Sequence, residues 1–156
     1  MTASIFCYDF ETTGIDPYRD RPLQVAGIRT NEQLEEIAEP LNIYCQLSDD
    51  ILPHPMASLI TGISPDILRT QGLPEVEFIR QLHAQMLQPG TCSAGFNNLR
   101  FDDEMTRATL YRNFYDPYAR EWQGHNSRWD LIDVLRCTWA LRPEGLQWPQ
   151  HEGRAS

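Results

Sequence analysis

The chain has 156 residues, of which 41% are hydrophobic, and its formal net charge is −9. A chain of this length forms one domain with a real hydrophobic core. The negative charge argues against a protein that coats nucleic acid, because phosphate binding normally needs a basic surface. It leaves open a nuclease whose acidic side chains hold metal ions.

Neither a membrane span nor a secretion signal is visible. No apolar run approaches the ~20 residues that cross a bilayer, and residues 1–4 lack the basic region of a signal peptide. The cysteines at positions 7, 45, 92 and 137 are far apart and have no CxxC spacing. We therefore expect a cytoplasmic protein with no membrane partner, whose four cysteines are buried, reduced thiols.

The first predicted strand spans residues 5–10 and ends at a Thr-Thr-Gly turn. Side chains alternate between the two faces of a strand, so Asp9 and Glu11 share one face and Phe10 points to the other. Two neighbouring carboxylates repel each other unless a cation compensates them, and their hard oxygens suit Mg²⁺ or Mn²⁺. The pattern alone leaves open a solvated acidic strand end that binds no metal.

The remaining elements predict a mixed α/β sheet. Short linkers join the first three strands, which favours an antiparallel meander. Ser64 is expected to cap a helix that starts with Pro and Asp, and Ser127 to cap the last helix. Further strands are predicted at 22–30, 43–47 and 91–96, and helices at 56–60, from 64, and at 74–87, 101–113 and 127–141.

A second acidic cluster, Asp102, Asp103 and Glu104, begins the helix predicted after the fourth strand. The helix dipole favours acidic residues there, which explains Glu104. Asp103 has Arg107 four residues later, the favourable order for an ion pair along a helix. Asp102 has Thr at the corresponding position, so we expect Asp102, of the three, to face a metal or ligand.

Two stretches resemble motifs of a known enzyme family, the DEDD 3′→5′ exonucleases. Asp-Phe-Glu-Thr-Thr-Gly at residues 9–14 is similar to the first motif, and Asn-Leu-Arg-Phe-Asp at 98–102 is similar to the second, whose Asp is a metal-site acid. The resemblance is closest to the exonuclease I branch and extends to about residue 148. It also involves segments 20–22, 59–63, 97–104, 111–118, 126–130 and 140–145.

The resemblance implies a ribonuclease H-like fold, a mixed sheet with flanking helices whose first three strands are antiparallel. It implies an exonuclease domain over residues 1–148 and a polar tail at 149–156. Asp9, Glu11 and Asp102 would be catalytic acids that bind two Mg²⁺ ions, with Mn²⁺ as an alternative. Glu11 and Thr12 would contact the 3′-terminal nucleotide of the substrate.

The third motif of the family, a His followed by an Asp on a further helix, has no match in the chain. His125 and Asp130 have a similar spacing, but they precede the predicted last helix and match a different part of the family. The resemblance therefore implies a C-terminally truncated domain that lacks the general base and the fourth acid. We expect the chain alone to be inactive or very weak.

Single-stranded DNA is the implied substrate, and binding it requires cations for phosphates and flat faces for bases. The resemblance places Arg107, Tyr118, Trp122 and Arg136 on the DNA side. The alternative for the two aromatic residues is a core or lid position. The alternative for the two arginines is an ion pair with an acid of the same helix.

A protein partner is implied at Arg142, which follows the last predicted helix. An Arg there would bind the C-terminal carboxylate of the acidic tail of single-strand DNA-binding protein. Its alternative role is a cation near a helix C-terminus. The family suggests a monomer, and His54 and His83 are expected to be solvated.

The implied function is a metal-dependent 3′→5′ exodeoxyribonuclease that releases 5′-mononucleotides from single-stranded DNA in repair and recombination. Two alternatives stay open. One is a non-catalytic fragment that binds nucleic acid or a protein partner. The other is a 3′→5′ exoribonuclease that acts on short RNA, as in the oligoribonuclease branch of the family.

Overall fold

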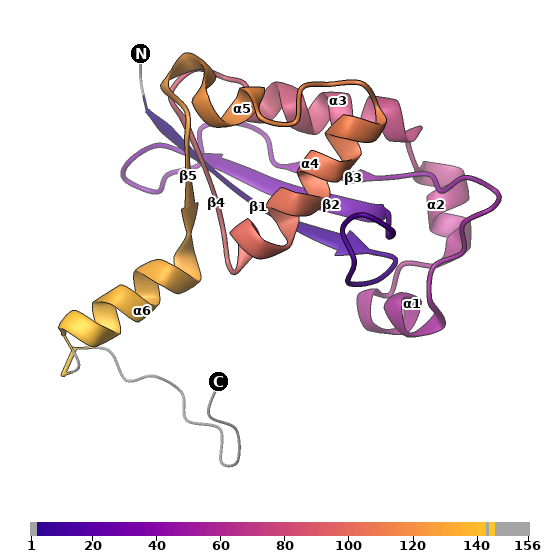
Figure 1. Cartoon of the computed structure of the whole chain (residues 1–156), viewed down its shortest axis with the longest axis horizontal. Coiled ribbons are helices and arrows are strands. Elements are labelled where there is room, and N and C mark those ends of the chain that lie inside the picture. Colours follow the sequence, from indigo (N-terminus) through magenta and orange to yellow (C-terminus); the bar gives the residue numbers. More distant parts are fainter. Residues whose placement is uncertain (1–2, 143, 146–156) are drawn as a thin grey trace.

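A five-stranded mixed sheet organises the described part of the fold (Figure 1). The computed structural model describes residues 3–142 and 144–145. Within them the strands stand in the order β3-β2-β1-β4-β5. They are β1 (Ser4–Thr12), β2 (Pro22–Thr30), β3 (Leu41–Tyr44), β4 (Thr91–Gly95) and β5 (Ser127–Asp130).

The pairing directions follow the lengths of the connections. β1 pairs antiparallel with β2, and β2 pairs antiparallel with β3, as the short linkers predict. β4 runs parallel to β1, and β5 runs parallel to β4, and each is reached through helices. The predicted fold class, a mixed α/β sheet whose first three strands are antiparallel, is confirmed.

Helices flank the sheet (Figure 1). α3, α4 and α5 lie over one face, α1 and α2 lie at the end near β3, and α6 projects from the end of β5 away from the sheet. None of the described helices is both long enough and apolar enough to cross a membrane. The helices are α1 (Pro55–Thr61), α2 (Pro65–Gln71), α3 (Glu75–Met86), α4 (Asp102–Arg112), α5 (Ala119–Trp122) and α6 (Leu131–Leu141), with short 3₁₀ turns η1 (Asn98–Arg100) and η2 (Gln123–His125).

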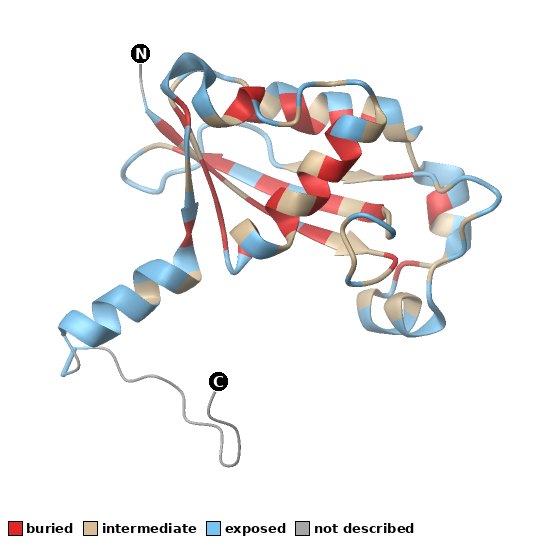
Figure 2. Ribbon diagram, viewed as in Figure 1, coloured by how far each residue is buried: buried red, intermediate tan, exposed pale blue. Residues whose placement is uncertain are grey.

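The core lies between the sheet and α3 and α4 (Figure 2). Alternation along β1 sends Phe6, Tyr8 and Phe10 into this core. Phe78 on α3 is fully buried against the same face. Burying one side chain of this size stabilises the fold by about 2–3 kcal/mol. The face of β1 that carries Asp9 and Glu11 is consequently directed away from α3.

The last helix begins later than predicted. Ser127 lies in β5 rather than at a helix cap, and α6 starts at Leu131 with Asp130 as its N-cap, accepting a hydrogen bond from Ile132 N. The physical reason is pairing with β4, which holds residues 127–130 extended and is a long-range interaction. Ser64 does cap α2, as predicted, by accepting a hydrogen bond from Ile67 N.

Two further expectations are corrected. Only Cys45 is buried. Cys7 and Cys92 are partly exposed, and Cys137 is exposed because it lies on α6, which has no buried residue. His83 is buried, not solvated, since it lies on the inward stripe of α3. The third strand ends at Tyr44, and the predicted tail at 149–156 lies outside the described residues.

A candidate metal centre between β1 and α4

Asp9 and Glu11 lie near the C-terminal end of β1, on the face opposite the core. Asp9 is exposed and stands across from Ala26 of β2, and Glu11 is partly buried across from Gln24. The buried residue between them, Phe10, points to the core. The two-residue periodicity predicted this shared face from the sequence.

Asp102 is brought to the same place by the connection after β4. β4 runs parallel to β1 with Ser4 opposite Thr91, so both strands end at the same edge of the sheet. The chain then turns through Asn97, whose φ of 58° is left-handed, and through η1 into α4. Asp102 is the first residue of α4 and is 4% exposed.

A direct hydrogen bond joins Asp102 to the strand. Its Oδ1 accepts from Phe10 N at 3.0 Å. Phe10 lies between Asp9 and Glu11 in the chain, so the contact fixes the third carboxylate beside the first two. The structure therefore places Asp102 beside the segment of β1 that carries Asp9 and Glu11.

The three carboxylates interact electrostatically. Burial and the Asp9 charge raise the pKa of Asp102 to about 7, against the Phe10 N–H, which lowers it. Burial and the Asp9 charge also raise the pKa of Glu11. Crowded acids that resist ionisation are the condition that a bound cation relieves.

The residues fit a divalent cation by chemistry. All three are carboxylates, the hard oxygen donors that Mg²⁺ prefers, and one is held in place by a backbone N–H. In residues 3–142 and 144–145, no three His, Cys, Asp or Glu side chains yet converge closely enough to enclose an ion.

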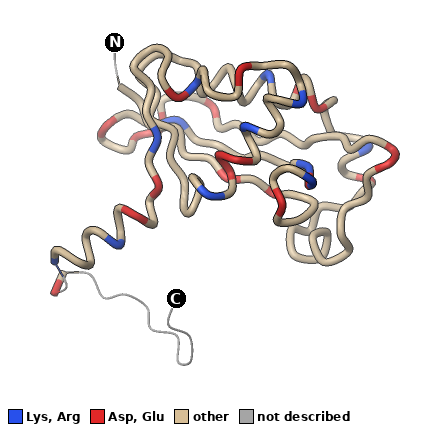
Figure 3. The backbone as a smooth tube through the Cα atoms, in the orientation of Figure 1, with Lys and Arg blue, Asp and Glu red and all other residues tan. Residues whose placement is uncertain are grey.

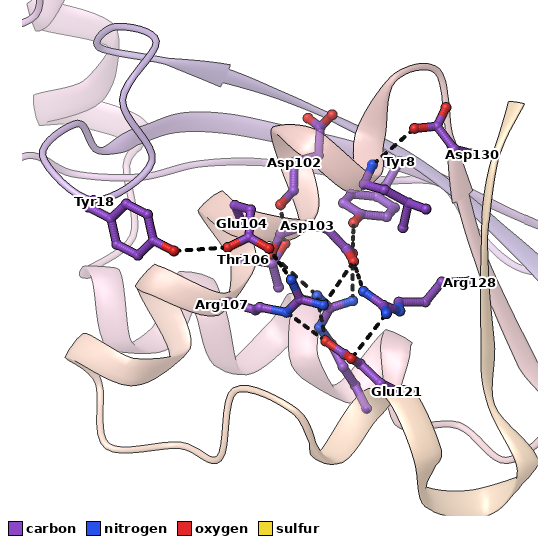
Figure 4. A network of polar contacts seen from close by, with 12 residues as sticks. Tyr8, Tyr18, Asp102, Asp103, Glu104, Thr106, Arg107, Glu121, Arg128 and Asp130 are labelled. Atoms are coloured by element: carbon purple, nitrogen blue, oxygen red, sulfur yellow. Dashed lines mark hydrogen bonds and ion pairs between the residues drawn. The ribbon is translucent and has the colours of Figure 1, made fainter. Parts of the chain in front are cut away.

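Beside the acids lies a buried polar network centred on Asp103 (Figure 4). Tyr8 Oη donates to Asp103 Oδ1 at 2.8 Å, Arg120 Nη1 lies 2.9 Å from the same oxygen, and Arg128 pairs with Oδ2. Burial raises the pKa of Asp103, but the three partners outweigh it and hold that pKa below its usual value. Asp103 is thus an ionised, fully buried carboxylate.

Arg107 lies at the edge of this network. It pairs with Glu104, with Glu121 at 2.7 Å and with Asp103 at 3.7 Å. The predicted pair with Asp103 is therefore present but is the longest of the three. The guanidinium also stacks over the ring of Tyr118 at 5.4 Å.

The other predicted binding residues lie in two places. Tyr118, just before α5, and Trp122, at its end, are exposed, and Tyr118 lies against Arg107. Arg136 and Arg142 are on and just after α6, which projects away from the sheet (Figure 1). Arg136 pairs weakly with Asp133 at 3.5 Å, and Thr12 Oγ1 donates to Gly14 O at 2.6 Å within the turn.

Charges alternate in sign over the fold. Figure 3 shows basic and acidic positions interspersed along the backbone. The network itself combines three arginines with three acids, namely Arg107, Arg120 and Arg128 with Asp103, Glu104 and Glu121.

The pair His125 and Asp130 does not form a site. His125 is exposed in η2, whereas Asp130 is buried and serves the backbone. Its carboxylate accepts from Asn97 N at 2.8 Å, Leu99 N at 3.3 Å and Ile132 N at 3.1 Å. The interpretation that this pair is not the third motif agrees with that geometry.

Sequence reasoning missed four members of the network: Tyr8, Arg120, Glu121 and Arg128. Tyr8 was assigned to the core face without a partner, and Arg120 lies in a segment predicted to be loose. Their partners are far away in sequence: 95 residues separate Tyr8 from Asp103. A charged residue amid aromatic neighbours, as at Arg120, was the one available signal.

Comparisons with known proteins agree with this architecture. The profile of the RNase T type exonuclease family matches residues 6–151. The chain is 52% identical over 145 residues to exodeoxyribonuclease I of Escherichia coli K12 and 50% identical over 145 residues to that of Haemophilus influenzae Rd. In both cases the matched segment is 93% of this chain, but it is only 30% and 31% of the length of those proteins.

Solved structures with this fold give the same result. An ExoI/SSB-Ct complex matches with a TM-score of 0.94 and 50% identity over 97% of this chain and 33% of that one. Exonuclease I from Methylocaldum szegediense matches at 0.92 and 57% identity, over 96% and 32%. A zinc-bound E. coli ExoI–ssDNA complex matches at 0.92 and 51%, over 96% and 32%. The expected ribonuclease H-like fold is thereby confirmed.

Proposed function

This chain belongs to the exonuclease family, and we propose that it carries three metal-binding acids of a 3′→5′ exodeoxyribonuclease that acts on single-stranded DNA. The observation that carries the proposal is the hydrogen bond from Phe10 N to Asp102, which joins the second motif to the first. The chain spans about 30% of the length of its curated relatives.

Asp9, Glu11 and Asp102 would hold two divalent ions, Mg²⁺ or Mn²⁺. When bound, such ions activate the attacking water and stabilise the leaving 3′-oxygen. The zinc-bound relative supports a site for a divalent cation. Asp102 would supply a fixed ligand because Phe10 N orients its carboxylate, and Glu11 and Thr12 would contact the terminal nucleotide.

The DNA strand would run past the exposed rings of Tyr118 and Trp122. Base stacking on an aromatic side chain contributes about 1–3 kcal/mol per base. Arg107, already stacked on Tyr118, would face the phosphates, and Arg136 would contact the strand from α6. Relatives solved with ssDNA support this assignment.

The acidic tail of single-strand DNA-binding protein is the proposed protein partner, bound through Arg142. A relative solved as an ExoI/SSB-Ct complex supports it. Arg142 is exposed and follows the last turn of α6, so its side chain is accessible to a carboxylate. We also propose a role in DNA repair and recombination, in the cytoplasm and as a monomer, because the resemblance to the family implies it.

The 156-residue chain is proposed to be inactive or very weak alone. Of the described residues, neither His125 nor Asp130 is proposed as the base that would deprotonate water. His125 is exposed in η2, and the carboxylate of Asp130 accepts hydrogen bonds from the backbone. General-base catalysis contributes typically about 10²–10⁴ in rate. Mg²⁺-dependent digestion by the purified chain, abolished by Asp9→Ala, would contradict this.

Digestion of 5′-labelled single-stranded DNA and RNA oligonucleotides tests the substrate. The longest product of the gene is compared with its Asp9→Ala variant, with Mg²⁺, with Mn²⁺ and with a chelator. Stepwise shortening of DNA from the 3′ end, lost in the variant and with the chelator, is expected. Cleavage of RNA alone would establish the exoribonuclease, and binding without cleavage would establish the non-catalytic alternative.

A further inference from the structure

We propose that Asp103 and Tyr8 are positioning residues that hold the first turn of α4 at a fixed angle against β1, so that Asp102 is directed toward Asp9 and Glu11. The inference deepens the proposed function and rests on its metal site. Neither Asp103 nor Tyr8 touches the reacting atoms in this assignment.

Two polar contacts join successive residues of α4 to alternate residues of β1. Phe10 N donates to Asp102 Oδ1 at 3.0 Å, and Tyr8 Oη donates to Asp103 Oδ1 at 2.8 Å. A single contact would let the helix start pivot about that point. Two contacts made from different positions along the strand fix its rotation as well as its distance.

The second contact is itself held in place. Asp103 is 0% exposed and Tyr8 is 4% exposed. Arg120 of α5 and Arg128 of β5 form ion pairs with the Asp103 carboxylate. Asp103 therefore receives contacts from three elements besides its own helix, and its carboxylate has little freedom to turn.

A contribution to stability alone does not explain why this buried network of charged residues is present. Buried ion pairs lose hydration on folding, and apolar residues of similar volume often replace them at no loss of stability. Here the costly network lies one residue from the predicted metal ligand and on the strand that carries the other two. That location is what a device for directing Asp102 requires.

Tyr8→Phe is the sharpest variant, because it removes one hydroxyl and leaves Asp103 paired with Arg120 and Arg128. Tyr115→Phe is the matched control, because Tyr115 packs against the same core, contacts the ring of His83 and forms no hydrogen bond with Asp103 in the described part of the chain. Ile79→Val is a second control that lowers stability by a core change alone.

The first measurement is hydrogen exchange at the Phe10 amide of the 156-residue chain, which needs no metal. Tyr8→Phe is expected to speed this exchange about fivefold relative to the amides of β2, the effect of losing one hydrogen bond. Tyr115→Phe and Ile79→Val are expected to change all strand amides together. Uniform exchange in Tyr8→Phe would overturn the proposal.

The second measurement is Mn²⁺ binding by calorimetry, with circular dichroism as the check on folding. Tyr8→Phe is expected to weaken binding about fivefold and Asp103→Asn more, while both controls bind as the parent chain does. Parent-like Mn²⁺ affinity in Tyr8→Phe would also overturn the proposal. If the parent chain binds no Mn²⁺, the proposed metal site fails in this chain, and the exchange result still decides the positioning.

Discussion

The junction of β1 with α4 and the helix α6 differ in how far their residues are buried. At the junction, Asp102 and Asp103 are buried and bonded to the strand. α6 has no buried residue in the described chain (Figure 2). Its Trp139 and Leu141 are exposed to solvent. The positions of the acids of the proposed metal site thus depend on core packing. The positions of Arg136 and Arg142 depend on the direction of one exposed helix.

The largest expected difference between the two regions concerns apolar packing. Phe78→Ala should lower the free energy of unfolding by about 3–5 kcal/mol, because it opens a cavity under β1. Trp139→Ala, at a side chain 48% exposed, should lower it by less than about 1 kcal/mol. Urea unfolding followed by circular dichroism checks both, and equal losses would show that α6 is packed in solution.

A smaller difference is expected for charges. Arg120→Met removes a fully buried partner of Asp103 and should cost about 3 kcal/mol. Arg136→Met on α6 removes an exposed pair with Asp133 and should change the stability by no more than about 0.5 kcal/mol. Thermal unfolding of both variants measures the difference, and a neutral Arg120→Met would mean that Tyr8 and Arg128 satisfy Asp103 without Arg120.

Metal binding should weaken as pH falls below about 7. The pKa of Asp102 is raised to about 7, so below that pH a proton occupies the carboxylate and must leave before an ion binds. The apparent affinity should fall by up to about tenfold per pH unit. Mn²⁺ titrations between pH 5 and 8 test this, and a flat profile would remove Asp102 from the ligand set.

The smallest expected effect is an acid-induced loss of stability at His83. Burial and the nearby Arg120 lower its pKa, while Asp116 raises it. The unfolded chain then binds the proton more readily, so the contribution to stability is full above about pH 6.5 and is lost as pH falls. His83→Phe should reduce the change in melting temperature between pH 7 and 5; an unchanged slope would contradict it.

The sequence predicted the features that depend on interactions between residues close together in the chain. Period-two alternation placed Asp9 and Glu11 on one face, and the cap at Ser64 marked the start of α2. Asp102 was selected because it had no partner within its own helix. The family motifs then supplied the chemistry, which spacing alone left open.

Long-range contacts explain what the sequence did not predict. Ser127 has the composition of a helix cap, but pairing with β4 makes it part of a strand. Arg107 was assigned to Asp103 by helical spacing, whereas Tyr8, Arg120 and Arg128 come from other elements to that carboxylate. Such partners become neighbours only when the sheet and α5 assemble, so no window of sequence contains them.

The carboxylate of Asp130 gives the two regions a mechanical link. It accepts hydrogen bonds from Asn97 N and Leu99 N in the loop that leads to Asp102, and from Ile132 N in the first turn of α6. One carboxylate therefore fixes both the start of the projecting helix and the loop before α4. A change in the direction of α6 would therefore shift, through Asp130, the loop that leads to Asp102.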